Sequence, residues 1–361
     1  MTPVPLPVPE LRTRVTELTG VRYPIVQTGM GWVSGPELTA ATANAGGLGI
    51  LASATLSREE MVAGIRLIRS RTEAPFGVNL VGTATDVRQR AELLVAEKVP
   101  VASFALAPKQ DVFRLLKDAG IVVIPSIGAR RHAEKMAAWG ADAVLVQGGE
   151  GGGHTGQVPT GLLVPQVVDA VEIPVIAAGG FFDGRGLVAA LAYGAEAIAM
   201  GTRFLLTSDS TVPANVKQAY LSAGLDGTVV TDLIDGVPQR VLRTPLVEEL
   251  VSGRGGGPRG VVRAVRSAVA LKQHVGESWP GIVRQGLAMR RQRELSLRQL
   301  LMAANTPMMI RTGMVEGRVD LGSLASGQVA GLIDELPSCA ELIDRIVTEA
   351  EKTLARLGGT S

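Results

Sequence analysis

A glycine-rich segment with one histidine is the part of the sequence best suited to chemistry. It reads Gln147-Gly-Gly-Glu-Gly-Gly-Gly-His154-Thr-Gly156 and follows an apolar run at 143–147. A main chain without side chains can lie flat against a planar ligand, and a histidine exchanges protons near neutral pH. A single histidine is more often structural, but one in a glycine loop beyond a strand end favours general acid/base catalysis. We therefore predict His154 as the catalytic residue.

Two further glycine segments favour a phosphate site. Gly179-Gly180-Phe181 begins at the last residue of the apolar run 175–179, and Gly201-Thr202-Arg203 follows the run 197–200. Glycines at such points allow backbone N–H groups to approach a phosphate. A single loop of this kind is usually a tight turn, but two neighbouring ones predict a phosphorylated cofactor or substrate, with the Thr202 hydroxyl as an added donor.

Two earlier segments place polar or small residues at the same kind of position. Thr28-Gly29-Met30 follows the run 24–27, and Asn79 lies at the end of the run 76–80, next to its last residue. Other motifs are weak or missing. Gly151, Gly153 and Gly156 match G-x-G-x-x-G, but the next residues do not open a helix, so we reject a dinucleotide fingerprint. The sequence has no phosphate-binding P-loop, zinc-protease or serine-hydrolase motif.

Eight short apolar runs must position these segments. Strands that are apolar throughout and alternate with amphipathic helices, such as 57–71 and 88–98, indicate a parallel sheet covered on both sides. Eight such units predict an α/β fold, a (β/α)₈ TIM barrel, whose active site lies at the carboxyl ends of the strands. The runs are 24–27, 48–51, 76–80, 101–105, 122–126, 143–147, 175–179 and 197–200.

The pattern changes after the eighth run. We predict a barrel over 1–206, a smaller, basic and mostly helical second domain over 207–306, and a C-terminal segment, 307–361, that returns to the barrel. Between Arg240 and Arg311 there are 13 Lys and Arg against four Glu, a net charge of +9, so the rest of the chain carries −7. This segment either faces an anionic partner or is a solvated helical surface, and the sequence leaves both open.

Composition excludes several classes of protein. With 46% hydrophobic and 19% charged residues the chain has the profile of a packed domain and not of disorder. The single cysteine, Cys339, excludes an intramolecular disulfide and a cysteine-based zinc cluster, and favours the cytoplasm. The N-terminus has no signal-peptide pattern, and no apolar run approaches the ~20 residues of a membrane span. We expect no metal site and no membrane partner.

The segments described above, taken together, resemble one family. Gln27-Thr28-Gly29-Met30, Gly77-Val78-Asn79, Gln147 to His154, Ala178-Gly179-Gly180 and Met200-Gly201-Thr202-Arg203-Phe204 are similar to the nitronate monooxygenase family, formerly the 2-nitropropane dioxygenases, which includes the FMN-dependent enoyl reductases. The resemblance covers most of the chain. Within the family, 40–55, 101–110 and 201–213 look closest to actinobacterial enzymes of steroid ring C/D degradation, which act on bicyclic coenzyme A thioesters.

The resemblance implies an FMN site and a role for each matching residue. Thr28, Gly29 and Met30 would lie along the flavin ring, and Asn79 would reach its polar edge. His154 would be the acid/base beside flavin N5. The remaining binding residues would flank the ribityl chain, in the case of Gln147 and Gly151, or hold the phosphate, in the case of Gly179, Gly180, Gly201 and Thr202. Many relatives read Glu-Ala-Gly-Gly-His where this chain has Glu150-Gly-Gly-Gly-His154, so the loop is more flexible here.

The reaction expected from this resemblance is flavin-dependent redox chemistry. The leading hypothesis is an oxidoreductase that introduces or reduces a carbon–carbon double bond in an alicyclic CoA thioester, with the arginine-rich segment binding the CoA phosphates. The alternative enzyme is a monooxygenase that oxidises alkyl nitronates with O₂. A third possibility is a protein that binds nucleic acid or another anionic partner, but Trp279 is the one aromatic residue of the basic segment, so it offers no stacking platform. The oligomeric state stays open, with a homodimer among the options.

Overall fold

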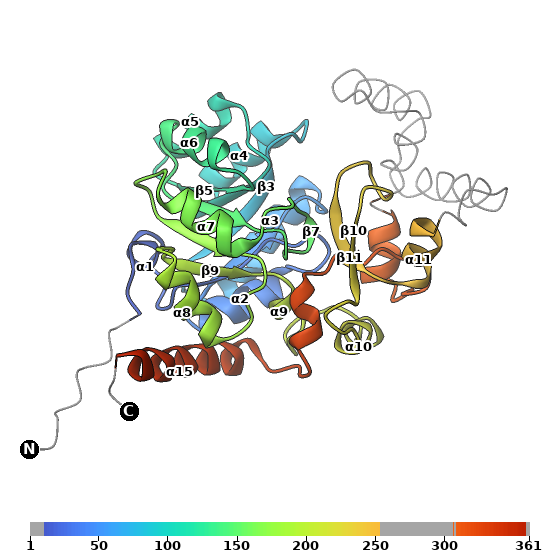
Figure 1. Ribbon diagram of the computed structural model, residues 1–361. Coiled ribbons are helices and arrows are strands. Elements are labelled where there is room, and N and C mark those ends of the chain that lie inside the picture. Colours follow the sequence, from blue (N-terminus) through green and yellow to red (C-terminus); the bar gives the residue numbers. More distant parts are fainter. Residues whose placement is uncertain (1–10, 253–305, 307, 359–361) are drawn as a thin grey trace, which may run out of the picture. The chain divides into compact units, whose positions relative to one another are not determined.

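The chain forms two compact units. The computed structural model describes residues 11–252, 306 and 308–358. The first unit comprises Met1–Gly151, Gly156–Thr211 and Ile333–Ser361, and the second comprises Gly152–Thr155 and Val212–Leu332. Figure 1 shows both units coloured along the sequence. The domain boundaries predicted after residues 206 and 306 stay predictions.

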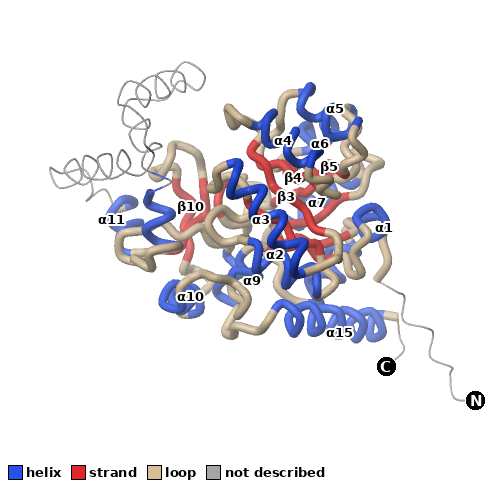
Figure 2. Tube along the Cα trace, turned by 180° about the vertical axis from the view of Figure 1, so that it is seen from behind, coloured by secondary structure: helices blue, strands red, loops and turns tan. Residues whose placement is uncertain are grey.

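The first unit is a closed barrel of parallel strands, as the sequence predicts. The strand order is β1-β2-β3-β4-β5-β6-β8-β9, and β9 pairs with β1 to close it. Figure 2 shows these strands surrounded by helices. The strands are β1 (Ile25–Gln27), β2 (Leu48–Ala52), β3 (Phe76–Val81), β4 (Val101–Ala105), β5 (Val122–Ile127), β6 (Val144–Gln147), β8 (Val175–Ala178) and β9 (Ala197–Met200).

Small aliphatic side chains fill the barrel. Side chains from several strands meet in one buried cluster, because every second residue of a barrel strand points inward. The cluster includes Val26, Ile50, Val101, Leu145 and Ile176. The strands therefore read as continuous apolar runs with few aromatics. The helices of this unit are α1 (Arg14–Thr19), α2 (Pro36–Asn44), α3 (Arg58–Arg71), α4 (Val87–Ala96), α5 (Gln110–Asp118), α6 (Arg130–Ala138), α7 (Thr160–Val168), α8 (Gly184–Ala192), α9 (Thr202–Leu205) and α15 (Cys339–Leu357).

The C-terminal helix α15 packs against α8 of the barrel. It begins with a capping box in which Ser338 and Glu341 satisfy each other's backbone amides. A side chain at Gly184 would collide with the backbone of Ile346 and Ala350, so the two helices approach closely. The carboxylate of Glu349 accepts a hydrogen bond from the Gly184 amide at 2.8 Å. These contacts place α15 in the barrel unit.

The described part of the second unit contains a small antiparallel sheet. The strand order is β10 (Thr228–Thr231), β11 (Gln239–Leu242) and β7 (Gly153–His154). Helices α10 (Ala214–Leu221) and α11 (Pro245–Val251) and a 3₁₀ helix, η2 (Gln328–Leu332), accompany it. This sheet was not predicted from the sequence, because its strands are short and lie in turn-rich sequence, and the prediction of a mostly helical domain stays a prediction. Residues 253–305, which carry most of the basic pattern, lie outside the described residues.

Among the described residues, no helix is long and apolar enough to cross a membrane.

Candidate active site

The ends of β1, β3 and β9 bring five predicted site residues together. A Cβ atom added at Gly29 would lie 2.5 Å from the Asn79 Cβ, so glycine is required there. A Cβ at Gly201 would lie 3.3 Å from the Thr28 hydroxyl and 3.2 Å from the Met30 sulfur. The predicted segments at these three strand ends therefore form one rim, and its close packing leaves main chain and small polar groups at the barrel mouth.

A buried polar network holds the first loop. The Gln27 side chain is fully buried and donates hydrogen bonds to the Ser34 hydroxyl at 2.8 Å and to the Ile50 carbonyl at 3.3 Å. Ser34 donates to the Thr28 carbonyl at 2.8 Å and accepts from the Met30 amide at 2.9 Å. These bonds fix the backbone on both sides of Gly29. Ser34 was not among the predicted site residues, because a serine seven residues beyond a strand carries no signal of its own.

Thr160 joins the loop after β6 to the end of β8. Its hydroxyl and amide lie 2.6 and 2.9 Å from the same Glu150 carboxylate oxygen. Side chains added at Gly148 or Gly179 would collide with the Thr160 hydroxyl. Gly179 and the following Gly180 have φ values of +103° and +82°, which residues other than glycine rarely adopt. The loop with the histidine segment and the loop with the predicted phosphate glycines are therefore tied together within the barrel unit.

The remaining predicted binding residues also lie at strand ends. A Cβ at Gly151 would lie 2.6 Å from the Gln147 amide nitrogen, so this loop folds back on the end of β6. Thr202 is buried and starts α9. The neighbouring Arg203 is buried as well, and its guanidinium donates to the carbonyls of Leu206 at 2.5 Å and Glu335 at 3.0 Å. Burial lowers the pKa of Arg203 to about 10. The bond to Glu335 connects Arg203 to the segment that leads into α15.

The residue types at the barrel mouth suit a flat, phosphorylated cofactor. The close-packed glycines present main chain in place of side chains, Asn79 and Thr28 add polar groups, and consecutive left-handed glycines occur at the end of β8. Backbone amides of this kind suit a phosphate, and a bare main chain suits a planar ring. All ten residues predicted to bind a cofactor belong to this one unit.

His154 pairs with a carboxylate in the second unit. It lies in β7, where it is the register partner of Gln239 in β11. Its Nε2 atom is 2.6 Å from an oxygen of Asp235, and the side chains are 61% and 13% exposed, respectively. Burial acts to raise the pKa of Asp235, but the hydrogen bond and charge of His154, the Val237 amide and the Gln239 side chain lower it overall. The carboxylate is therefore held ionised beside the imidazole.

This arrangement corrects the expected environment of His154. From the sequence we expected it in a glycine loop beyond a strand end, whereas the structure places it in a two-residue strand with an acidic partner. Asp235 was missed, because it lies 81 residues away in the chain. Its one local signal is the Asp-Gly pair of a turn, which is common in proteins.

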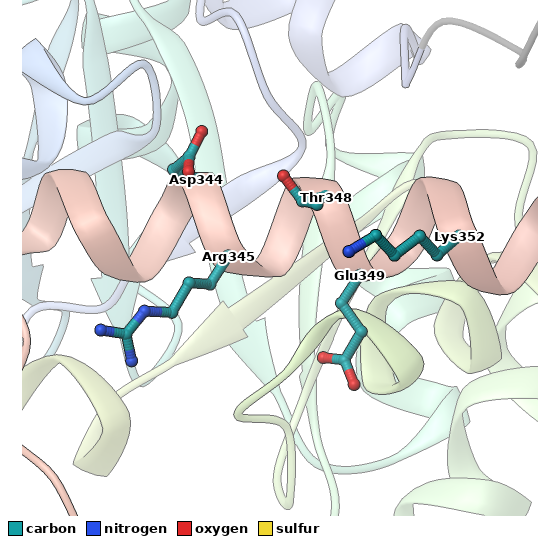
Figure 3. A pocket seen from close by; sticks show the side chains of 5 residues that line it. All are labelled: Asp344, Arg345, Thr348, Glu349 and Lys352. Carbon is teal, nitrogen blue, oxygen red and sulfur yellow. The ribbon is translucent and has the colours of Figure 1, made fainter.

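A surface hollow of about 260 Å³ also occurs in the barrel unit. It is lined by Asp344, Arg345, Thr348, Glu349 and Lys352, which project from α15 (Figure 3). None of the predicted site residues lines it. Among the described residues, no group of three or more His, Cys, Asp or Glu side chains is arranged to hold a metal ion.

Comparison with known proteins tests the family assignment. Residues 12–92 and 81–349 match the family model described as nitronate monooxygenase. A protein of Mycobacterium tuberculosis is 61% identical over 343 residues, which is 94% of this chain and 96% of that protein. A Rhodococcus jostii protein is 58% identical over 348 residues, which is 96% and 98% of the two chains. Both are named (3aS,4S,5R,7aS)-5-hydroxy-7a-methyl-1-oxo-octahydro-1H-indene-4-carboxyl-CoA dehydrogenase.

A solved structure agrees with the fold. That of FabK from Thermotoga maritima has a TM-score of 0.79 and 36% sequence identity, and the match covers 97% of this chain and 99% of that one. The chain is therefore an oxidoreductase, and its family is flavin-dependent. Both the barrel and the resemblance seen in the sequence are confirmed. The chain belongs to the nitronate monooxygenase family.

Proposed function

We propose that this chain is an FMN-dependent dehydrogenase that introduces a carbon–carbon double bond into a bicyclic CoA thioester derived from steroid rings C and D. Two relatives of about the same length, 61% and 58% identical to this chain, carry the name of an indene-carboxyl-CoA dehydrogenase. The word dehydrogenase favours oxidation over reduction as the direction of the reaction. The single cysteine further supports our proposal that the protein works in the cytoplasm.

The observation that carries the proposal is the contact of Gly29 with Asn79 at the barrel mouth. It brings the loop after β1 to a polar side chain of β3 and leaves bare main chain between them. In the proposed site, Thr28, Gly29 and Met30 lie along the flavin ring and Asn79 contacts its polar edge. Gln147 and Gly151 flank the ribityl chain, and the phosphate is held by the residues at the ends of β8 and β9, namely Gly179, Gly180, Gly201 and Thr202.

His154 supplies the acid/base chemistry in this proposal. Forming an α,β-double bond next to a thioester requires loss of a proton from the α-carbon and of a hydride from the β-carbon. The thioester carbonyl makes the α-hydrogen acidic, and His154 takes it as a proton. When bound, FMN would supply the acceptor for this hydride. The protein's own part is to hold the base, to orient the thioester and to keep the ring in place.

The CoA end of the substrate requires cationic groups. We propose that the basic segment between Arg240 and Arg311, with its net charge of +9, binds the phosphates of CoA. Arginine forms paired hydrogen bonds with phosphate oxygens. Most of this segment lies outside the described residues, so individual arginines are not assigned.

An absorbance spectrum of the purified protein tests the cofactor. We expect the near-ultraviolet and visible absorption bands of an oxidised flavin, and release of FMN on denaturation. Apoprotein prepared by removing the flavin should recover the bands when FMN is added. A protein that lacks flavin and cannot be reconstituted with FMN would contradict the proposal.

The second candidate is oxidation of alkyl nitronates with O₂, which the name of the family model favours. Nitronates are small and do not need an extended cationic surface. Oxygen consumption with propionate 3-nitronate, compared with flavin reduction by CoA thioesters, separates the two reactions. We expect efficient turnover with the thioester and little with the nitronate.

A further inference from the structure

A carboxylate in the turn between β10 and β11 is held in one position beside His154. One oxygen of Asp235 lies 2.6 Å from His154 Nε2, and the other accepts a hydrogen bond from the Val237 amide at 3.0 Å. Because each oxygen has a different partner, the carboxylate cannot rotate without losing one of these bonds. The side chain is 13% exposed, so little water competes for it.

The turn that carries Asp235 is anchored on both sides. Ile234 is buried in a small apolar cluster with Val241 and Val247, and its carbonyl accepts a hydrogen bond from the Thr306 hydroxyl at 2.9 Å. On the other side, the Gly236 amide donates to the Asp232 carbonyl at 2.8 Å. The turn therefore has little freedom to move the carboxylate away from the histidine.

The histidine is fixed by the same sheet. β7 pairs with β11, and the Thr155 amide donates to the Pro238 carbonyl at 3.2 Å. Gln239 is the register partner of His154 and is 3% exposed. Its side chain lies close enough to Asp235 to lower the pKa of that carboxyl. Within the described residues, the Nε2 atom of Gln239 has no hydrogen bond of ordinary geometry. Donor and acceptor are thus positioned by adjacent strands of one unit.

We infer that Asp235 is a positioning residue that sets the orientation and the tautomer of His154. An ionised carboxylate can only accept a hydrogen bond, so in the neutral imidazole the proton sits on Nε2 and the lone pair sits on Nδ1. Nδ1 is then the atom that takes the substrate proton. This inference rests on the proposed role of His154 as the base, and it adds the residue that prepares the base for that role.

The tautomer can be measured without any substrate. The chain has three histidines, His132, His154 and His274, so protein with ¹⁵N-labelled histidine gives few imidazole signals in long-range ¹H–¹⁵N spectra. The His154→Gln variant assigns the signals of His154 by their loss. We expect the neutral ring of His154 to be protonated on Nε2 in the wild-type protein.

Substitutions in the turn show whether Asp235 causes this preference. Asp235→Asn should abolish or reverse the preference for the Nε2-protonated form, since the amide can also donate to the ring, whereas Asp235→Glu retains a carboxylate and should keep it. Asp232→Asn is the matched control, because Asp232 is an exposed aspartate of the same turn. The inference is overturned if Asp235→Asn leaves the nitrogen shifts of His154 as they are in the wild-type protein.

Kinetics with the bicyclic CoA thioester provide an independent test. His154→Gln should lower kcat/KM by about 10²- to 10⁴-fold, the range for loss of a general base, and Asp235→Asn should lower it by no more than that, because the base itself is retained. The double variant should be no slower than His154→Gln alone, since Asp235 acts through His154. Losses that multiply in the double variant would contradict the inference. A wild-type protein inactive with the thioester would refute the proposed function, while the tautomer measurement would still decide the role of Asp235.

Discussion

Glu150 accepts hydrogen bonds from both the hydroxyl and the backbone amide of Thr160, at 2.6 and 2.9 Å. Glu150 belongs to the loop after β6, and Thr160 is the first residue of α7. The Thr160 hydroxyl also lies 3.0 Å from the Gly179 carbonyl at the end of β8. One threonine therefore connects the two loops that we propose to flank the ribityl chain and the phosphate of FMN.

Replacing Thr160 with valine should weaken FMN binding. The substitution removes the hydroxyl and leaves the Glu150 carboxylate with the amide alone, so the two loops lose their link. A hydrogen bond to a charged group contributes about 1.5–3 kcal/mol, which corresponds to a loss of affinity of about tenfold or more. Titration of the apoprotein with FMN, followed by quenching of flavin fluorescence, measures this. Thr160→Ser retains the hydroxyl and serves as the control, and equal affinity of Thr160→Val and the wild-type protein would contradict the link.

Adding a methyl group at Gly29 should damage the barrel mouth. The new Cβ would lie 2.5 Å from the Asn79 Cβ, and both atoms belong to buried or half-buried positions that cannot move apart freely. We expect Gly29→Ala to lose about 1–3 kcal/mol of stability, the usual effect of overpacking, and to bind FMN more weakly. Gly31→Ala in the same loop is the control, because Gly31 is exposed and its Cβ would meet only the end of the Thr55 side chain at 3.3 Å. Thermal unfolding and FMN titration of both variants would show the difference, and similar behaviour of the two would argue against the close contact.

The ion pair of His154 and Asp235 predicts how the stability of the protein depends on pH. The pKa of Asp235 in the folded protein is below its ordinary value, so the folded state keeps the carboxylate ionised more strongly than the unfolded chain does. The contribution of the pair is therefore fully present above the ordinary pKa and is lost as the pH falls through the lowered value.

Urea unfolding between about pH 5 and pH 3 can test this dependence. The free energy of unfolding of the wild-type protein should exceed that of Asp235→Asn at pH 5, and the difference should narrow as the pH falls. Asp232→Asn should differ little from the wild-type protein over the whole range. A difference in the free energy of unfolding between the wild-type protein and Asp235→Asn that grows as the pH falls would contradict this ion pair.

The single thiol should be unreactive in the folded protein. Cys339 is fully buried at the start of α15, and burial raises its pKa to about 12. Because the thiolate is the reactive form, we expect an aromatic disulfide reagent to titrate no thiol at neutral pH in native protein and one thiol in urea. Fast reaction of native protein would mean that α15 leaves the barrel readily.

The barrel could be predicted from the sequence because its strands are buried on both faces. Such strands are continuous apolar runs, and each of the eight runs corresponds to a strand of the barrel. Helices with clear periodicity were located well too, as α3 shows, which spans Arg58–Arg71 where the sequence predicted 57–71. The glycine segments were found for a related reason, since they follow directly on those runs.

The residues that sequence reasoning missed act through contacts between distant parts of the chain. Asp235 and His154 are paired by a sheet whose third strand has two residues, too few for any hydropathy pattern. Ser34 and Thr160 are small polar residues of ordinary type, and their importance comes from the hydrogen-bond acceptors that surround them. Nothing in the local sequence reports which acceptors these will be.

The most direct test of the account is anaerobic mixing of the FMN-loaded protein with the bicyclic hydroxy-methyl-oxo-indane-carboxyl-CoA thioester. We predict that the visible flavin absorbance falls within the turnover time and that one equivalent of the α,β-unsaturated thioester forms for each flavin reduced. His154→Gln should bind the thioester but reduce the flavin far more slowly. Flavin that stays oxidised in the wild-type protein while propionate 3-nitronate is consumed with O₂ would contradict the proposed dehydrogenase and favour the monooxygenase.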